Sequence, residues 1–365
     1  MRVGYLLRYY PALTETFVRS EIAGVVARGV DAWIGALGAR DDGAPCDGPD
    51  PAPVRRIGRP WHARLRGPGS AAARQLAAWQ RPKDAARLVA LRAAARGTDL
   101  LHAHFAGENA ELAWALHVET GLPYTVTVHA VDLFKPRPSL GAVLGAAAAV
   151  LTVSAYNQAL LAARGVESAV VRCGPPLGAP LPPRDGPGLR LLFVGRDVPK
   201  KGLDTLLTAM ESAPDGVSLS VVGPPARAAA MPRVRWCGPL PPAAVRAAID
   251  AHDLLVLPCR RAPDGDQDGV PLALMEALAR GRPVLTTPLS GIPELVDDAV
   301  GWLVPPDDPR ALGQAIAAAQ DPAARRNRGA AGPAQLRARG FTLDAQVDGV
   351  LTAWRSVFTA LAPAR

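Results

Sequence analysis

The chain has 365 residues, of which 49% are apolar and 20% are charged, and its formal net charge is +8. This composition excludes a disordered chain, and the length suggests two domains of about 100–200 residues each. No stretch reaches the roughly 18 apolar residues of a membrane helix, and Arg8 interrupts the first apolar run too early for a signal peptide. We therefore expect a cytoplasmic protein. The four cysteines have no paired spacing, so neither a disulfide framework nor a zinc site is expected.

Short apolar runs alternate with amphipathic stretches of helical length along the first half of the chain. Such an alternation is typical of a parallel sheet that helices cover on both faces. The expected strands are 3–7, 32–37, 99–103, 124–128, 150–153 and 169–172. The expected helices are 14–28, 108–119 and 155–164.

The alternation stops between Gly174 and Gly188, where four glycines and six prolines occupy positions that neither a helix nor a central strand can use. It then resumes. The expected elements are strands 189–194, 217–222, 254–257 and 283–286, and helices 203–212, 243–251 and 271–280. The pattern predicts an α/β protein with two Rossmann-like domains that face each other across a cleft. Its predicted parts are residues 1–173, a linker 174–188, residues 189–340, and a C-terminal helix in 341–365 that returns to the first domain.

A strand-to-helix turn at residues 194–202 carries cationic side chains. Ligands of parallel sheets bind where strands end, and a following helix offers unpaired N–H groups to anions. Arg196 can bind a phosphate bidentately, and Lys201 can bind it as a point charge. The alternative is that both are ordinary surface charges on a loop.

A second turn of this kind precedes the helix predicted at 271–280. Pro271 suits a helix start, so Gly269 and Val270 would present their amides to an anion. Glu276 falls about one and a half turns into that helix, where its carboxylate can reach ribose hydroxyls.

The same turn has two competing interpretations as a metal site. Asp264, Asp266 and Asp268 match the opening of a calcium loop, but the glutamate due at position twelve is Met275, and Glu276 misses by one. An Asp-x-Asp pair that holds a metal on a nucleotide sugar belongs to a different, single-domain architecture. We therefore expect no metal here.

Histidines mark two strand ends in the first half. His102 and His104 end one predicted strand, and His129 follows the next, with Asp132 three residues later. For His102 we favour a core histidine with satisfied hydrogen bonds, because a metal would need ligands that the sequence does not clearly supply. The dinucleotide, P-loop and hydrolase-elbow motifs are absent, which disfavours those enzyme classes.

Several motifs together resemble retaining GT-B glycosyltransferases of the glycosyltransferase group 1 family, most closely the branch of colanic acid and other exopolysaccharide enzymes. The resemblance covers nearly the whole chain. The motifs are residues 10–17, 101–105, 129–134, 194–196 with 200–202, 266–277 and 291–296.

The resemblance implies a role for each matching residue. The catalytic positions are His129, which would face the donor sugar, Arg196 and Lys201, which would hold the donor diphosphate, and Asp268, which would contact sugar hydroxyls. Glu276 would bind the ribose. Further donor-binding positions are Gly269, Val270, Pro271, Leu272, Gly238, Pro239 and Leu240. The positions expected on the acceptor side are Thr14, Glu15, His104 and Asp132. No metal or other cofactor is expected beyond the nucleotide sugar itself.

The sequence departs from the family pattern at residues 173–176, Cys-Gly-Pro-Pro. Relatives carry a hydrophobic residue and an aspartate after this glycine, so the role of that aspartate in donor binding or at the hinge is in doubt. A milder change is Thr14-Glu15-Thr16 in place of Ser-Glu-Thr.

The expected function is transfer of a hexose-type sugar, with retention, from a nucleotide diphosphate to a hydroxyl of a glycan or lipid-linked acceptor in cell-surface polysaccharide synthesis. Three alternatives stay open. They are a glycosyltransferase of small natural products, a hydrolase or epimerase of nucleotide sugars on the same fold, and a non-catalytic subunit of a glycan-assembly complex.

Residues 55–96 hold eleven basic residues and one acid, and Trp61, Leu65, Leu76 and Trp79 are interleaved with them. This pattern favours an interfacial surface that docks on an anionic inner leaflet, so the protein would be peripheral on the cell membrane. The alternative is an ordinary solvated helix pair. No nucleic-acid-binding motif accompanies the charge, and no nucleic-acid partner is expected.

Overall fold

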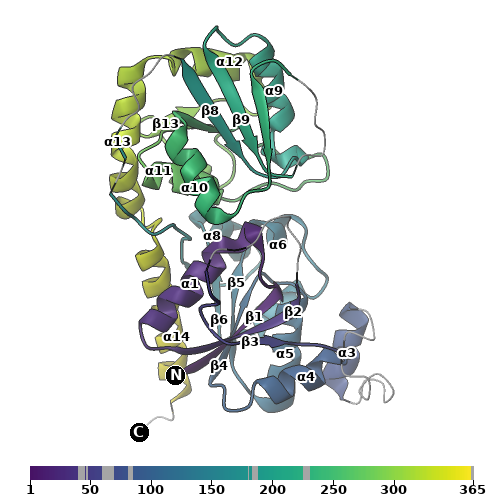
Figure 1. Cartoon of the computed structure of the whole chain (residues 1–365). Helices are drawn as coiled ribbons and strands as arrows, with labels where there is room; N and C mark the ends of the chain where they lie inside the picture. Colours follow the sequence, from purple (N-terminus) through teal and green to yellow (C-terminus); the bar gives the residue numbers. More distant parts are fainter. Residues whose placement is uncertain are drawn as a thin grey trace. The chain divides into compact units, whose positions relative to one another are not determined.

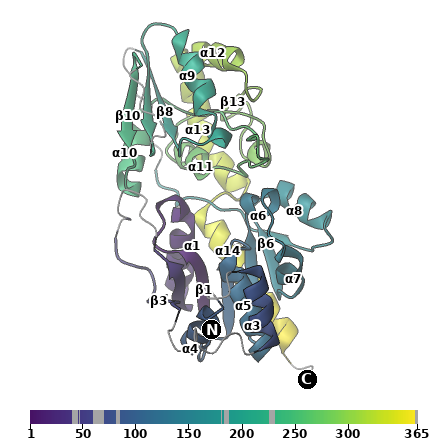
Figure 2. The same ribbon diagram turned by 90° about the vertical axis from the view of Figure 1, so that its right-hand side faces the viewer.

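The computed structural model describes residues 1–39, 46, 48–59, 70–80, 85–179, 181–182, 188–224 and 231–362. The chain forms two compact α/β units, which Figures 1 and 2 show from two sides. Unit 1 contains the described residues of 1–41, 48–171 and 347–365, and unit 2 is built on Arg172–Gln346. No helix of the described residues is long and apolar enough to cross a bilayer.

Unit 1 contains a parallel sheet of seven strands in the order β3-β2-β1-β4-β5-β6-β7. Its strands are β1 (Arg2–Tyr9), β2 (Asp31–Gly38), β3 (Val54–Arg56), β4 (Leu100–His104), β5 (Tyr124–Val128), β6 (Ala149–Thr152) and β7 (Ala169–Val170). Its helices are η1 (Leu13–Glu15), α1 (Thr16–Ala27), α3 (Ala71–Trp79), α4 (Arg87–Ala94), α5 (Glu108–Thr120), α6 (Ala130–Phe134), α7 (Leu140–Gly145) and α8 (Ala155–Ala162).

Unit 2 contains a parallel sheet of six strands in the order β10-β9-β8-β11-β12-β13. Its strands are β8 (Leu189–Val194), β9 (Val217–Val222), β10 (Val234–Gly238), β11 (Leu254–Leu257), β12 (Val284–Thr286) and β13 (Gly301–Leu303). Its helices are η3 (Pro199–Lys201), α9 (Leu203–Glu211), α10 (Pro242–Ala251), α11 (Leu272–Ala279), η4 (Ile292–Glu294), α12 (Pro309–Ala318) and α13 (Pro322–Ala338). Two Rossmann-like domains are thereby confirmed.

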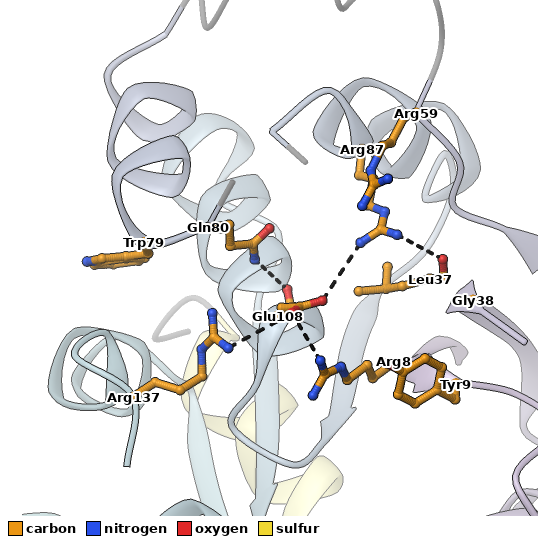
Figure 3. A pocket seen from close by; sticks show the side chains of 10 residues that line it. All are labelled: Arg8, Tyr9, Leu37, Gly38, Arg59, Trp79, Gln80, Arg87, Glu108 and Arg137. Atoms are coloured by element: carbon orange, nitrogen blue, oxygen red, sulfur yellow. Dashed lines mark hydrogen bonds and ion pairs between the residues drawn. The ribbon is translucent and has the colours of Figure 1, made fainter. Parts of the chain in front are cut away.

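The first strand of each unit lies inside its sheet: β1 lies between β2 and β4, and β8 lies between β9 and β11. The chain therefore changes its direction of travel across the sheet at these strands, and loops diverge there to leave a crevice at the carboxyl edge. In unit 1, Arg8 from the end of β1 and Glu108 from the start of α5 meet at this edge (Figure 3). In unit 2 the corresponding loops follow β8 and β11.

Alternation along β4 gives the sheet of unit 1 two different faces. Leu101 and Ala103 belong to an apolar cluster in which α5 packs on β1 and β4. The side chain of His102 between them points to the other face, because successive residues of a strand alternate. This second face is polar and histidine-rich, which makes it the more informative one for function.

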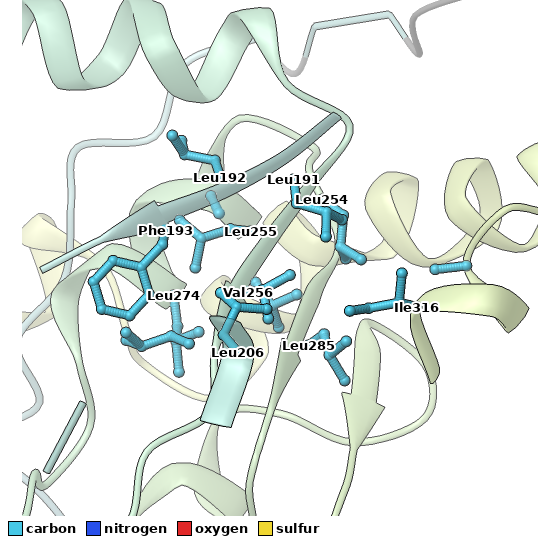
Figure 4. Close-up of a cluster of buried hydrophobic side chains, with 14 of the residues drawn as sticks. Leu191, Leu192, Phe193, Leu206, Leu254, Leu255, Val256, Leu274, Leu285 and Ile316 are labelled. Atoms are coloured by element: carbon cyan, nitrogen blue, oxygen red, sulfur yellow. The ribbon is translucent and has the colours of Figure 1, made fainter. Parts of the chain in front are cut away.

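The core of unit 2 is continuous and apolar (Figure 4). Phe193 of β8, Val256 of β11 and Leu285 of β12 are fully buried, and Leu274 of α11 packs into the same cluster. These runs of buried residues explain why the strands read as continuously apolar in the sequence. The core fixes the carboxyl ends of β8 and β11 and thus the loops that follow them.

Helix α14 (Leu343–Leu361) supplies a large part of the second face of unit 1 from Val347 onward. Trp354 is fully buried, and its ring lies 5.4 Å from that of His102 and 5.8 Å from that of Tyr5. Its indole N–H donates to the hydroxyl of Thr125, 3.3 Å away. A segment far along the chain therefore completes the core of the first unit.

The segment that departs from the family pattern is held closely within unit 2. The Gly174 N–H donates to the Gln346 side-chain oxygen at 3.2 Å, and the Leu343 N–H donates to the Pro175 carbonyl at 3.1 Å. A Cβ on Gly174 would lie 2.3 Å from the carbonyl carbon of Phe341, so only glycine fits. Residues 180 and 183–187 of the predicted linker lie outside the described part of the chain.

Candidate functional site

The loops after β8 and β11 of unit 2 pack directly against each other. Gly202 closes the first loop with φ 65°, and a Cβ there would lie 1.9 Å from the carbonyl oxygen of Pro258 in the second. A side chain at this position would separate the loops. The glycine therefore lets the lysines of η3 reach the acidic residues that follow β11.

The structure brings Lys201 and Asp268 together as an ion pair. The Lys201 Nζ lies 2.8 Å from one Asp268 oxygen, and the Lys200 Nζ lies 3.5 Å from the other. The thiol of Cys259 also donates to Asp268, at 3.6 Å. Two residues that the resemblance assigns to the diphosphate and to the sugar thus form an ion pair with each other.

Opposing effects set the pKa values of this pair. Burial alone would lower the pKa of Lys201, but the Asp268 carboxylate outweighs it and raises that pKa. Burial would likewise raise the pKa of Asp268, yet Lys201 and Lys200 hold it below its usual value. Both groups are therefore charged at neutral pH. Burial and the neighbouring Asp268 carboxylate raise the pKa of the Cys259 thiol, which stays protonated.

Unpaired donors surround the ion pair. Arg196 is half-buried after β8, and its guanidinium group makes no hydrogen bond or ion pair with the described residues. Pro271 is the N-cap of α11, and the N–H groups of Gly269 and Val270 just before it have no hydrogen-bond partner in the described ranges. An arginine, a lysine and a helix N-terminus are a donor set suited to phosphate.

Glu276 lies half-buried within α11, and its carboxylate forms no hydrogen bond or ion pair with any described residue. Burial raises its pKa to about 7, and the charge of Arg246 only partly opposes the shift. An unpaired, half-buried carboxyl is costly to the fold. It remains available for hydroxyl groups of a ligand.

The raised pKa predicts how Glu276 affects stability across pH. The folded protein keeps this proton up to about pH 7, while the unfolded chain releases it near its model value of 4.5. The native state binds more protons in that window, so the contribution of Glu276 to stability falls as pH rises through it. Glu276→Gln should therefore raise the melting temperature over wild type more at about pH 8 than at about pH 5. An equal difference at both values, with the exposed Glu211→Gln as control, would contradict this.

Gly238 is the last residue of β10, and Pro239 and Leu240 follow it at the same carboxyl edge of the sheet. The carbonyl of Gly238 accepts the Gly223 N–H at 2.9 Å, and a Cβ on Gly223 would lie 1.9 Å from the Gly195 carbonyl oxygen. The turns after β8, β9 and β10 are thus stacked backbone to backbone. Leu272, the first residue of α11, begins the helix on the other side of β8.

The calcium interpretation finds no support in the geometry of its aspartates. Asp266 accepts a hydrogen bond from Lys200 at 3.2 Å, Asp268 pairs with Lys201, and Asp264 accepts the Asp266 N–H at 3.1 Å. Their oxygens therefore face lysines and backbone rather than a shared centre. Among the residues that the structure describes, these aspartates form no group close enough to hold a metal ion.

The polar face of unit 1 contains a residue that sequence analysis missed. Glu21 of α1 is 1% exposed, and its carboxylate accepts from the Tyr5 hydroxyl at 3.0 Å and contacts His104 Nε2 at 3.0 Å. The other ring nitrogen of His104 lies 3.3 Å from His129 Nε2. A connected line of side chains thus runs from Tyr5 through Glu21 to His129.

His102 has the satisfied core environment expected of it. Its two ring nitrogens lie 2.7 Å from the Thr125 hydroxyl and 3.2 Å from that of Thr127. Glu21, His102 and His104 together are close enough to hold a metal ion, so the structure supplies the third side chain that the sequence did not. Hydrogen bonds already occupy both nitrogens of His102. The cluster therefore needs no ion for polar satisfaction.

His129 and Asp132 are held together at the start of α6. The backbone N–H of His129 donates to the Asp132 carboxylate at 2.9 Å. Burial, and then repulsion from His104, lowers the pKa of His129 well below its usual range, so its ring is neutral at neutral pH. Burial raises the pKa of Asp132 to about 6 against the backbone hydrogen bonds it accepts. Asp132, expected on the acceptor side, thus positions the backbone of His129.

Two other acceptor-side positions precede this cluster in the chain. Thr14 and Glu15 fall in η1, directly before α1, and Glu15 is half-buried. The side chain of Thr14 lies outside the described residues. The structure therefore places His104, His129 and Asp132 in one cluster and Thr14 and Glu15 at the start of the helix that carries Glu21.

The basic segment at 55–96 is only partly a free surface. Arg55 donates to the Ala94 carbonyl and stacks 4.8 Å over Trp33, and Arg87 donates to the Leu37 carbonyl. Leu76, expected as a membrane anchor, is fully buried in the core of unit 1. The anchoring role of Leu76 is therefore wrong, because this side chain has no access to a membrane. Trp61, Leu65 and the charges within 60–69 and 81–84 lie outside the described residues. Docking on an anionic membrane stays a prediction.

Comparison with known proteins assigns both halves of the chain to one class. Residues 14–177 match the model of the glycosyl transferase 4-like domain, and residues 188–321 match that of glycosyl transferases group 1. The chain is 55% identical over 75 residues to WcaL of Escherichia coli K12, named as a colanic acid biosynthesis glycosyltransferase. That match covers 20% of this chain and 18% of WcaL.

Two further likenesses extend over more of the chain. TuaC of Bacillus subtilis, named for teichuronic acid biosynthesis, is 30% identical over 245 residues, or 60% of each protein. These relatives are thus matched over less than two thirds of their length. Among solved structures, Anabaena HepE in complex with UDP-glucose superposes with a TM-score of 0.73 at 16% identity, covering 98% of this chain and all of that one. From its two matched domains and its fold, the chain belongs to the group 1 glycosyltransferases with a GT-B architecture.

Proposed function

We propose that this chain is a retaining glycosyltransferase that moves a hexose-type sugar from a nucleoside-diphosphate donor to a hydroxyl of a glycan or lipid-linked acceptor in cell-surface polysaccharide synthesis. The family membership and the names of WcaL and TuaC support transfer in such a pathway. The complex of HepE with UDP-glucose supports a nucleotide sugar as donor.

The observation that carries the proposal is the donor set at the carboxyl edge of the unit 2 sheet. Arg196, Lys201 and the amides before α11 are gathered there from the loops after β8 and β11. Only Glu276 offers an unpaired carboxylate among the described residues of α11. The hydrogen-bond donors suit the diphosphate of a nucleoside diphosphate, and the single carboxylate suits the hydroxyl groups of its ribose.

The proposed role of the ion pair is an exchange of partners. A bound diphosphate competes with Asp268 for the Lys201 ammonium, because both are anions within reach of one cation. Asp268 keeps Lys200 and the Cys259 thiol as partners when Lys201 turns away. The oxygen that Lys201 leaves still accepts the Cys259 thiol, and its other lone pair is then available to a hydroxyl of the donor sugar.

The chemistry is then mainly electrostatic. The bond between the anomeric carbon and the phosphate oxygen breaks while the acceptor oxygen bonds to the same face of that carbon. The acceptor proton passes to the departing phosphate oxygen, so no enzymic nucleophile is consumed and configuration is retained. Arg196, Lys201 and the helix amides stabilise the charge that develops on the diphosphate.

Turnover with a panel of nucleotide sugars, beginning with UDP-glucose, tests this proposal. Each donor is offered with and without a neutral or anionic sugar acceptor, and the anomeric configuration of the product is determined by NMR. Transfer that needs the acceptor and retains configuration supports the proposal. Release of free sugar without any acceptor favours the hydrolase alternative, and binding of nucleotide without turnover favours the non-catalytic one.

We also propose that the reaction needs no metal ion, because cations of the protein serve the diphosphate. Activity is expected to survive saturating EDTA. The measurement is the transfer rate before and after chelation, with manganese and calcium added back. A loss that either metal restores would overturn this expectation and would point to the aspartates that follow β11 or to the Glu21 cluster.

A further inference from the structure

Unit 1 contains a cavity of about 550 Å³ at the carboxyl edge of its sheet, and none of the candidate donor- or acceptor-site residues named above lines it (Figure 3). It lies at the crevice between β1 and β4, where ligands of such sheets bind. Its lining comes from the ends of β1 and β2, from α3 and α4 and from the start of α5. The lining residues are Arg8, Tyr9, Leu37, Gly38, Arg59, Trp79, Gln80, Arg87, Glu108 and Arg137.

The charge of this lining is strongly one-sided. It contains four guanidinium groups and one carboxylate, that of Glu108. Arg8, Arg87 and Arg137 approach Glu108 at 3.3, 3.8 and 4.0 Å, longer than a charge-assisted hydrogen bond of about 2.7–2.9 Å. Figure 3 shows them converging on this carboxylate from β1, from α4 and from the loop between α6 and α7. One anion is loosely shared by several cations.

The base of the cavity holds the arginines in place. Arg137 donates through Nε and Nη2 to the fully buried Glu111 at 2.7 and 3.1 Å, and Arg87 donates to the Leu37 carbonyl at 3.1 Å. Gln80 donates to Glu111 at 2.7 Å, while its side-chain oxygen is buried without a partner among the described residues. Counting Glu111, four positive charges still face two negative ones. The guanidinium groups of Arg87 and Arg137 are therefore pre-oriented, and the lining as a whole is net positive.

We propose that this cavity binds the oxyanion of an anionic acceptor, a sugar that carries a phosphate or a carboxylate group. The inference rests on the proposed function and specifies the class of its acceptor. Guanidinium groups bind both kinds of oxyanion bidentately. The oxyanion of the ligand replaces Glu108 as the ionic partner of the arginines that surround this carboxylate. The indole of Trp79 at the wall offers an apolar face to the sugar ring.

Binding to the full chain tests the proposal independently of catalysis. The probes are glucose 1-phosphate, glucuronic acid and glucose, titrated calorimetrically with saturating UDP present to occupy the donor site. We expect one or both anionic probes to bind at least tenfold more tightly than glucose, with an affinity that falls as salt rises. Comparison of glucose 1-phosphate with glucuronic acid shows whether the cavity accepts a phosphate or a carboxylate. Equal binding of all three probes would overturn the proposal.

Two substitutions with opposite expected signs separate a binding site from a structural network. Arg8→Gln should weaken the preferred anionic probe about tenfold, and Arg8 is half-exposed, so the fold should tolerate the change. Glu108→Gln removes the competing anion and should tighten the same probe. A purely structural role would make both variants weaken binding or leave it unchanged, and either result would refute the proposal.

Arg92→Gln is the matched control. Arg92 lies on α4 like Arg87 but is exposed and does not line the cavity. This variant should bind the probes as wild type does, and a loss equal to that of Arg8→Gln would attribute the effect to net charge alone and overturn the site. If anionic probes bind as predicted but no sugar is transferred to any acceptor, the proposed function fails while the binding site stands.

Discussion

Replacement of Lys201 by alanine is expected to lower kcat/KM for the nucleotide sugar by about ten- to a hundredfold. The loss corresponds to one charged hydrogen bond to the diphosphate, roughly 1.5–3 kcal/mol. The Lys201 ammonium lies 2.8 Å from Asp268. Gly202, the next residue, packs against Pro258 just after β11. In the same variant Asp268 keeps only Lys200 as a cationic partner among the described residues. Steady-state kinetics with varied donor measures the effect.

Lys200→Ala is the matched control for this experiment. Lys200 belongs to the same turn η3, but its closest partner is Asp266 at 3.2 Å, and it lies farther from Asp268 than Lys201 does. We expect a clearly smaller loss than with Lys201→Ala. Equal losses in the two variants, with unchanged circular dichroism, would show that the turn matters only through its total charge.

Trp354→Ala is expected to destabilise unit 1 by about 3–5 kcal/mol, because it empties a fully buried site and leaves the Thr125 hydroxyl without its indole donor. The neighbouring rings of Tyr5 and His102 lose an aromatic contact at the same time. Urea denaturation followed by circular dichroism gives the overall change. Hydrogen exchange in β5 locates it.

The control for Trp354→Ala is Arg355→Ala, at the next position of α14 and exposed. It should change stability by less than about 0.5 kcal/mol. Exchange in β9 of unit 2 should be the same in both variants and in wild type. Faster exchange in β9 but not in β5 with Trp354→Ala would contradict the assignment of this end of α14 to the core of unit 1.

The bounds predicted for β5, β8, β9 and β11 coincide with those of the structure. Strands β5 and β11 are buried throughout, and such runs have clear ends. Strand β9 alternates instead, with Ser218 exposed between buried Val217 and Leu219. Strand β10 was missed. It is an edge strand in which Arg235 is exposed and the other residues are half-buried, and it has no apolar run to reveal it.

The candidate sites were predictable as positions but not as contacts. Lys201 and Asp268 each follow a recognisable strand, yet their ion pair depends on which strands become neighbours, and local patterns do not encode this. Glu21 was missed because one acid on an amphipathic helix is typical of a solvent-facing residue. Its burial follows from His104, which lies far along the chain and reaches it only in the folded sheet.

Charge counting alone gave an incomplete account of the basic segment. The sequence shows how many arginines lie in 55–96 but not where their guanidinium groups point. In the structure Arg55 and Arg56 bind backbone carbonyls of unit 1, and Arg59 and Arg87 line the cavity at its sheet edge. Tertiary packing sets the direction in which each guanidinium group points, and this direction distinguishes a solvated patch from an anion site.

The order in which residues leave the ribosome has a consequence for the two cores. All the strands of unit 2 lie within Arg172–Gln346, so its core can close once this stretch has been made. The sheet of unit 1 is synthesised earlier but must wait for Trp354, and until then Tyr5, His102 and Thr125 lack the side chain that covers them. Domains commonly fold in the order of their synthesis. Here the half that is made first is the last to be completed.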